Sequence, residues 1–187
     1  MPLDFSKNGF ADSFQQALRE GINLFCGAGF SVGAVDIEGH KLPVGAGLLT
    51  ELKQNFLDIG SYTNLSRACT KLCKTDKTAL YSFLERRFKV HTFDELYHLL
   101  KRINIKNVYT ANINDLFFKI YEDSLLYLNG GSQAGASYDE ALAIHYHPLH
   151  DCIRNEGDYV FDVIDLVKVY LRQGNTQSWQ YLANLSF

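Results

Sequence analysis

Residues 22–33, INLFCGAGFSVG, combine a short apolar run with a cluster of glycines. The run at 22–26 has the length and apolar character of a buried strand. It leads directly into Gly27-Ala28-Gly29. A strand that ends in such a turn and opens a helix lets the backbone approach a diphosphate closely, while free N–H groups bind its negative charge. This segment therefore favours an α/β fold with a phosphate-binding turn.

The glycine spacing differs from that of the common dinucleotide fingerprint, Gly-x-Gly-x-x-Gly. The third glycine, Gly33, comes one residue late. The fingerprint also needs an acidic residue about 20 positions further on, and the candidate, Glu51, lies within a predicted helix rather than at a strand end. A standard dehydrogenase therefore fits badly, and the turn alone is also compatible with a tight turn that binds no ligand.

Composition narrows the function classes. The 187 residues are 47% hydrophobic and carry a formal net charge of −3, which suits a single domain over residues 1–187. Lysines and arginines are scattered, so direct nucleic-acid binding is not expected. No apolar run reaches the roughly 20 residues that span a bilayer, and the N-terminus lacks a signal-peptide layout, so we expect no membrane contact and a cytoplasmic location.

Strands and helices alternate along the chain. Apolar periodicity and turn residues predict helices at 11–20, 46–58, 64–103 and 116–123, and strands at 22–26, 106–110 and 141–147. A capping box, Thr92 to Glu95, is predicted to begin the last helical piece of 64–103. Residues 158–172 and 176–185 are ambiguous between strand and helix. The alternation predicts a Rossmann-like parallel sheet with helices on both faces and a helical insertion over about 45–103.

Polar side chains follow the second of these strands, in the sequence YTANINDLF at 109–117. Thr110, Asn112, Asn114 and Asp115 thus lie at a strand's carboxyl end, where ligands bind in open α/β sheets. Asn and Asp are also common in turns and helix N-caps, so a cap explains Asp115 as well as a ligand does. Asn112, between strand and turn, is the stronger functional candidate.

Histidines gather around the third predicted strand, in the sequence AIHYHPLHD at 143–151. His145 and His147 alternate and should point to one face, with His150 just beyond the strand. A metal site built on these histidines lacks a carboxylate or thiolate to complete it, and the cysteines form a single Cys-x3-Cys pair, so no metal is expected. His150 is instead placed like a general base.

The chain contains, in this order, Gly-Ala-Gly-x-Ser at 27–31, Leu42-Pro43, Thr110-x-Asn112 and Leu149-His150. These four motifs resemble those of the sirtuin family, in which they hold the NAD diphosphate, the ribose and nicotinamide, and supply a histidine base. By position, the resemblance implies that Asn112 orients water or the ribose and that His150 is the base. It also implies NAD contacts for Gly27, Ala28, Gly29, Phe30, Ser31, Pro43, Thr110, Asn114 and Asp115.

Three positions depart from the sirtuin pattern. Ala111 replaces the usual glutamine, and Asn114 stands where an aspartate grips nicotinamide, with Asp115 one position late. Asp151 replaces the glycine that follows the histidine. Because an asparagine can still bond an amide, these departures affect catalysis more than binding.

The two cysteine pairs of the deacylase zinc module are not evident, and the chain is most similar to the sirtuin-like NAD hydrolases of bacterial antiphage defence. This resemblance implies hydrolysis of NAD, as substrate, to nicotinamide and ADP-ribose. It implies a sensor or ATPase domain or protein as partner, or a homo-oligomer. Because a Gly-x-Ser strand that closes on the adenosine is expected after the Leu-His motif, we expect this chain to be the N-terminal fragment of a longer protein.

Three alternatives stay open. A protein deacylase would use the same NAD chemistry but would need a groove for an acyl-lysine peptide and usually zinc. A non-catalytic NAD or ADP-ribose sensor would bind without releasing nicotinamide, as Asn114 and Asp151 allow. The plainest alternative is a structural α/β domain that mediates assembly.

Overall fold

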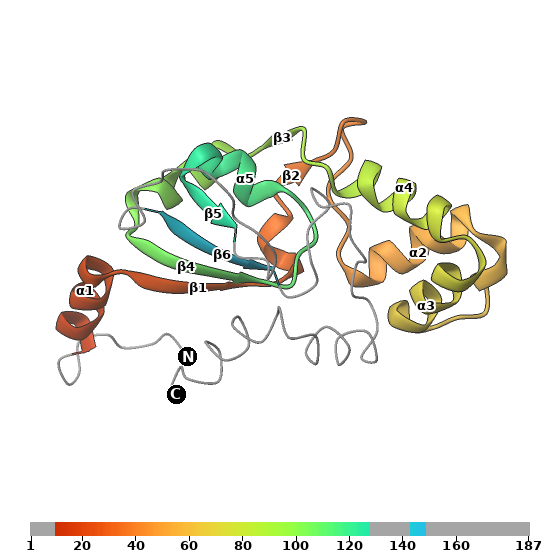
Figure 1. Cartoon of the computed structure of the whole chain (residues 1–187), viewed down its shortest axis with the longest axis horizontal. Helices are drawn as coiled ribbons and strands as arrows, with labels where there is room; N and C mark the ends of the chain where they lie inside the picture. The colour runs from red at the N-terminus through yellow and green to blue at the C-terminus, as the bar shows by residue number, and fades with distance from the viewer. Residues whose placement is uncertain (1–9, 128–142, 149–187) are drawn as a thin grey trace.

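A computed structural model of the chain describes residues 10–127 and 143–148 (Figure 1). It contains a four-stranded sheet whose strands all pair in parallel. In spatial order these strands are β1 (Ile22–Cys26), β4 (Ile105–Thr110), β6 (Ile144–Pro148) and β5 (Leu125–Tyr127). The predicted α/β class and parallel sheet are therefore confirmed.

Two helices connect directly to the sheet strands. α1 (Phe10–Glu20) precedes β1 and ends at Gly21, whose φ of 104° favours a residue without a Cβ atom. α5 (Leu116–Tyr121) follows β4, and the short 3₁₀ turn η4 (Glu122–Ser124) leads from it into β5. α5 packs on the sheet face that carries Val108 and Tyr146, which are both fully buried. Helices on the opposite face stay a prediction.

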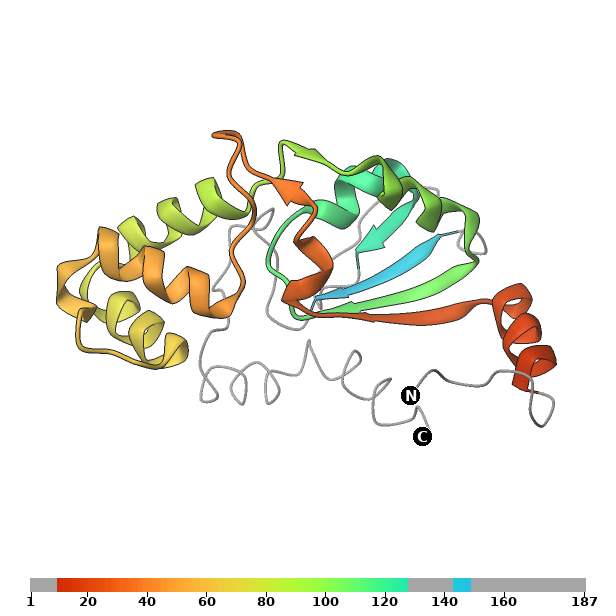
Figure 2. The same cartoon turned by 180° about the vertical axis from the view of Figure 1, so that it is seen from behind.

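A helical lobe lies between β1 and β4 in the sequence. It consists of α2 (Gly45–Asn55), the 3₁₀ turn η2 (Leu57–Ile59), α3 (Leu65–Thr75) and α4 (Lys77–Phe88). Leu52, Cys69 and Leu84 belong to its own apolar core and are fully buried. The lobe and α1 lie at opposite ends of the sheet in both views (Figures 1 and 2).

The helical insertion predicted over about 45–103 is interrupted by a short strand, and its last part is not α-helical. After α4 the chain extends into β3 (Thr92–Phe93), which pairs antiparallel with β2 (Ala34–Val35), and then forms the 3₁₀ helix η3 (Glu95–Arg102). The capping box at Thr92 is therefore wrong. Asp94 caps η3 instead, because its carboxylate accepts a hydrogen bond from Leu96 N–H at 2.8 Å. Pairing with a distant strand overrode the local helical pattern.

Smaller differences concern the ends of elements. The helix predicted at 46–58 ends at Asn55, and the strand predicted at 141–147 is β6. The edge strand β5 has only three residues and was not predicted. The ambiguous segments 158–172 and 176–185 lie outside the described residues. Within the part of the chain that is described, no helix has the length and apolar character needed to cross a membrane.

Candidate functional site

The candidate site forms where β1 and β4 end side by side. In this parallel pair Cys26 lies opposite Thr110, and Ala111 N–H donates to the Cys26 carbonyl at 3.1 Å. The glycine turn, residues 27–31, and the asparagine loop, residues 112–115, therefore leave the sheet at the same edge. This is the place where open α/β sheets bind ligands.

Ser31 joins these two segments. Asn112 Nδ2 donates to the Gly27 carbonyl at 2.9 Å and to Ser31 Oγ at 3.1 Å. Asn114 Nδ2 donates to the same Ser31 oxygen at 2.8 Å. Ser31, Asn112 and Asn114 are all buried, with exposed fractions of 7% or less. The residues predicted from two separate motifs thus form one hydrogen-bonded cluster.

The cluster leaves two polar functions for a ligand. The Ser31 oxygen accepts two hydrogen bonds from the amides, so its own proton can still be donated. Among residues 10–127 and 143–148, none donates a hydrogen bond to the Asn112 Oδ1 oxygen, and this oxygen is not fully buried. The edge of the cluster therefore offers one hydroxyl donor and one amide acceptor.

The glycine turn is open to solvent. It consists of Gly27 and the 3₁₀ turn η1 (Ala28–Ser31), whose first hydrogen bond runs from Phe30 N–H to the Gly27 carbonyl at 2.9 Å. The N–H groups of Ala28 and Gly29 precede the first hydrogen bond of the turn, so they have no acceptor within the turn itself. Both residues are exposed, and a Cβ atom added at Gly27 or Gly29 would meet nothing within 4 Å. The turn thus has room for a ligand close to its backbone.

The late third glycine has a structural explanation. A Cβ atom at Gly33 would lie 2.9 Å from the Tyr97 ring carbon Cε2, closer than side chains tolerate. Gly33 therefore makes room for Tyr97 of η3. The contact between Gly33 and Tyr97 was not predicted, because the two residues are 64 positions apart in the sequence, and the late glycine was its only local signal.

The remaining residues of the YTANIND segment stabilise the loop itself. Thr110 is fully buried, and its hydroxyl accepts a hydrogen bond from Asn112 N–H at 3.0 Å. Asn114 Oδ1 accepts from Leu116 N–H at 3.2 Å. Asp115 occupies the N-cap position of α5, yet its carboxylate does not cap the helix and accepts instead from Val90 N–H at 2.7 Å. The cap interpretation of Asp115 is therefore confirmed for its position at the start of α5 but not for a capping bond from its side chain.

Three further predicted site residues lie apart from this cluster or outside the description. The Phe30 ring stacks on Phe117 of α5 with centroids 4.8 Å apart, so only its backbone belongs to the turn. Pro43 is half-buried in the segment between β2 and α2. His150 and Asp151 lie outside the described residues, so the role of His150 as a base stays a prediction.

The histidines of β6 lie on one sheet face, as their alternation predicted. His147 and Tyr109 stack with centroids 4.5 Å apart, and His147 Nε2 lies 3.3 Å from Asn107 Oδ1. Burial of the imidazole, aided by the nearby His145, lowers the pKa of His147 to about 4. His147 is therefore neutral at neutral pH and forms part of the interior beneath the site.

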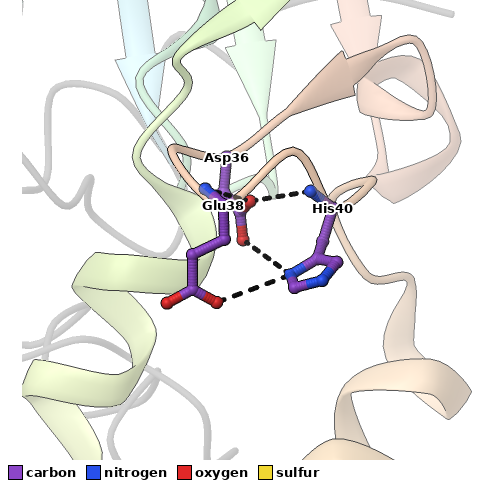
Figure 3. Close-up of side chains that lie close together, drawn as sticks. All are labelled: Asp36, Glu38 and His40. Carbon is purple, nitrogen blue, oxygen red and sulfur yellow. Dashed lines mark hydrogen bonds and ion pairs between the residues drawn. The ribbon is translucent and has the colours of Figure 1, made fainter.

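One group of side chains has the donor types of a metal site. Asp36, Glu38 and His40 bring their ligand atoms within 4.8 Å of one another (Figure 3). However, Asp36 Oδ1 already accepts from the N–H groups of Glu38 and His40, at 3.0 and 2.9 Å, and Oδ2 pairs with the guanidinium of Arg87. Arg87 also pairs with Glu51 of α2 at 2.7 Å. The group therefore connects the loop after β2 to the helical lobe.

Asp36 stays ionised in this network. Burial opposes its ionisation, but the amide of His40, the guanidinium of Arg87 and the amide of Glu38 outweigh that effect and lower the pKa of the carboxyl.

No protein-family model matches the chain, and no curated protein sequence matches it. The functional assignment therefore depends on the geometry of the site.

Proposed function

We propose that this chain binds NAD at the glycine turn and hydrolyses its nicotinamide–ribose bond. The observation that carries the proposal is the cluster in which Asn112 and Asn114 both bond Ser31, beside an open glycine turn at the carboxyl ends of β1 and β4. This juxtaposition supports one composite site built from the two motifs.

The available groups suit a dinucleotide. The N–H groups of Ala28 and Gly29 and the hydroxyl of Ser31 are donors, as a diphosphate requires. The Asn112 Oδ1 oxygen is an acceptor and suits a ribose hydroxyl, the nicotinamide amide or an attacking water. Donors and acceptor lie in neighbouring segments, so a single extended ligand can engage both.

Hydrolysis of the nicotinamide–ribose bond requires little acid catalysis from the protein. The C1′–N bond to nicotinamide breaks with its electron pair moving onto the cationic ring, which leaves as a neutral molecule. Water adds its oxygen to the oxocarbenium-like C1′ and loses a proton to a base. Asn112 would orient the water or the ribose, and His150 is proposed as the base because imidazole titrates near neutrality.

A non-catalytic NAD or ADP-ribose sensor is the second candidate, and one observation favours it. Asn112 Nδ2 and Asn114 Nδ2 both bond Ser31, so these amide donors serve the protein rather than a nicotinamide. A sensor would keep the affinity for NAD and release no nicotinamide. The cytoplasmic setting in bacterial antiphage defence, with a sensor partner or a homo-oligomer, is proposed from the resemblance to sirtuin-like hydrolases alone.

The test is incubation of the full-length protein with NAD while nicotinamide and ADP-ribose are followed by chromatography. We expect both products, and we expect Asn112→Ala and His150→Ala to abolish them while the melting transition persists. Asn107→Ala, on the same strand β4 but away from the cluster, is the matched control and should retain activity. Normal turnover in both site variants would contradict the assignment, and NAD binding without products would favour the sensor.

A further inference from the structure

Tyr97 of η3 contacts the same glycine turn to which the side-chain amides of the asparagine loop bond. Its hydroxyl donates to the Phe30 carbonyl and accepts from Gly33 N–H at 3.2 Å. These two backbone groups flank Ser31, one immediately before it and one two residues after it. A single phenol oxygen thus bridges the backbone on both sides of the residue to which Asn112 and Asn114 bond.

The Tyr97 ring fits this place closely. It meets the Phe30 ring edge-on, with centroids 5.4 Å apart and planes inclined by 70°. The space it fills exists because position 33 is a glycine, since a Cβ atom there would lie 2.9 Å from the ring. The backbone N–H of Asp94 also donates to the Gly33 carbonyl at 3.0 Å, so η3 and its N-cap hold the end of the turn together.

We propose that Tyr97 is a positioning residue of the nucleotide site. Its hydroxyl fixes the backbone around Ser31, so that the Ser31 hydroxyl and the N–H groups of Ala28 and Gly29 are arranged for a diphosphate before the ligand arrives. Such preorganisation raises affinity because less conformational freedom is lost on binding. The inference rests on the proposed function, since it takes a dinucleotide as the ligand.

A positioning role differs from a purely structural role in what the hydroxyl controls. Tyr97 is half-buried, and Gly27, Ala28 and Gly29 of the adjoining turn are exposed. Water can therefore replace the phenol at the Phe30 carbonyl and Gly33 N–H, and the ring keeps its packing when the hydroxyl is removed. Loss of the hydroxyl should cost little stability and should loosen the position of Ser31.

The test is Tyr97→Phe in the full-length protein, with dissociation constants for NAD and ADP-ribose measured by calorimetry. We expect both to rise about threefold to tenfold, the size of one net hydrogen bond, with little change in melting temperature. Tyr62→Phe in the helical lobe is the matched control and should bind as the wild type does. Ser31→Ala, alone and combined with Tyr97→Phe, completes a double-mutant cycle.

The cycle distinguishes positioning from general destabilisation. If Tyr97 acts through Ser31, removing its hydroxyl should weaken binding much less when Ser31 is already alanine. Unchanged affinity in Tyr97→Phe, or fully additive effects in the double variant, would overturn this inference and leave the proposed function intact. Absence of NAD and ADP-ribose binding by the wild-type protein would overturn the proposed function and this inference together.

Discussion

The two segments that meet at the site differ in how their groups are used. In the asparagine loop, Asn112, Asn114 and Asp115 are all buried and bonded within the protein. In the glycine turn, Gly27, Ala28 and Gly29 are exposed. The asparagine loop therefore fixes the shape of the candidate site, whereas the glycine turn keeps its backbone N–H groups available to a ligand.

The asparagine loop is in contact with three different parts of the molecule. Asn112 and Asn114 bond Ser31, and Asp115 bonds Val90 N–H, which follows α4. Ile113, between the two asparagines, is 5% exposed and belongs to the apolar core of the helical lobe. Substitutions in this loop should therefore lower stability, whereas substitutions at the exposed residues 27–29 of the glycine turn should disturb binding alone.

The largest predicted effect is a loss of folding stability in acid, which arises from the buried residue His147. Burial lowers the pKa of His147 to about 4 from its ordinary 6.5, so the unfolded chain binds a proton more readily. The stability that neutral His147 contributes is present above pH 6.5 and is lost as the pH falls toward 4, a change of about 3 kcal/mol.

Urea unfolding at a series of pH values measures this effect. His147→Gln should flatten the pH dependence in that range. His91→Gln, which replaces an exposed histidine, is the control and should leave the wild-type profile intact. The same acid dependence in wild type and His147→Gln would show that His147 is not its source.

The next effect concerns Asp115. Asp115→Ala removes the acceptor of Val90 N–H in a buried environment, and we expect the free energy of unfolding to fall by about 2 kcal/mol. Asp115→Asn keeps an oxygen acceptor and should lose less. Chemical denaturation compares the two variants, and an alanine variant as stable as the wild type would contradict the view that the loop is held by its buried bonds.

Ser31 belongs to both segments and should give an intermediate result. Ser31→Ala deprives Asn112 and Asn114 of a shared acceptor, and we expect a loss of about 1 kcal/mol in unfolding free energy. Since Ser31 also offers its proton to the ligand, affinity for ADP-ribose should fall in the same variant. Ser61→Ala, on an exposed segment of the lobe, should change neither quantity.

The sequence allowed the sheet and the candidate residues to be predicted because their signals are local. The apolar run before Gly27 and the turn residues after Thr110 mark β1, β4 and their carboxyl ends. The sequence did not reveal the partners, because Asn112 and Asn114 meet Ser31 across separations of 81 and 83 residues.

Elements that depend on distant pairing were missed for the same reason. Thr92 belongs to a strand because β2 lies beside it, and no signal within 92–103 indicates this. The three-residue strand β5 forms at the sheet edge through its pairing with β6. The contact of Tyr97 with the glycine turn could not be predicted either, because it depends on the space at Gly33.

Gly29→Ala gives the smallest expected change in stability and tests whether the glycine turn receives the ligand. Gly29 does not have a positive φ, and an added Cβ atom meets no protein atom within 4 Å, so the melting temperature should stay within about 2 °C of the wild type. Gly60→Ala, on an exposed turn of the lobe with φ of −52°, is the matched control.

Calorimetric titration with ADP-ribose is the decisive measurement. We expect Gly29→Ala to weaken binding about tenfold or more, since the methyl group occupies the space that the diphosphate needs, while Gly60→Ala should bind as the wild type does. Equal affinity in the wild type and in Gly29→Ala would contradict the claim that the glycine turn receives the ligand.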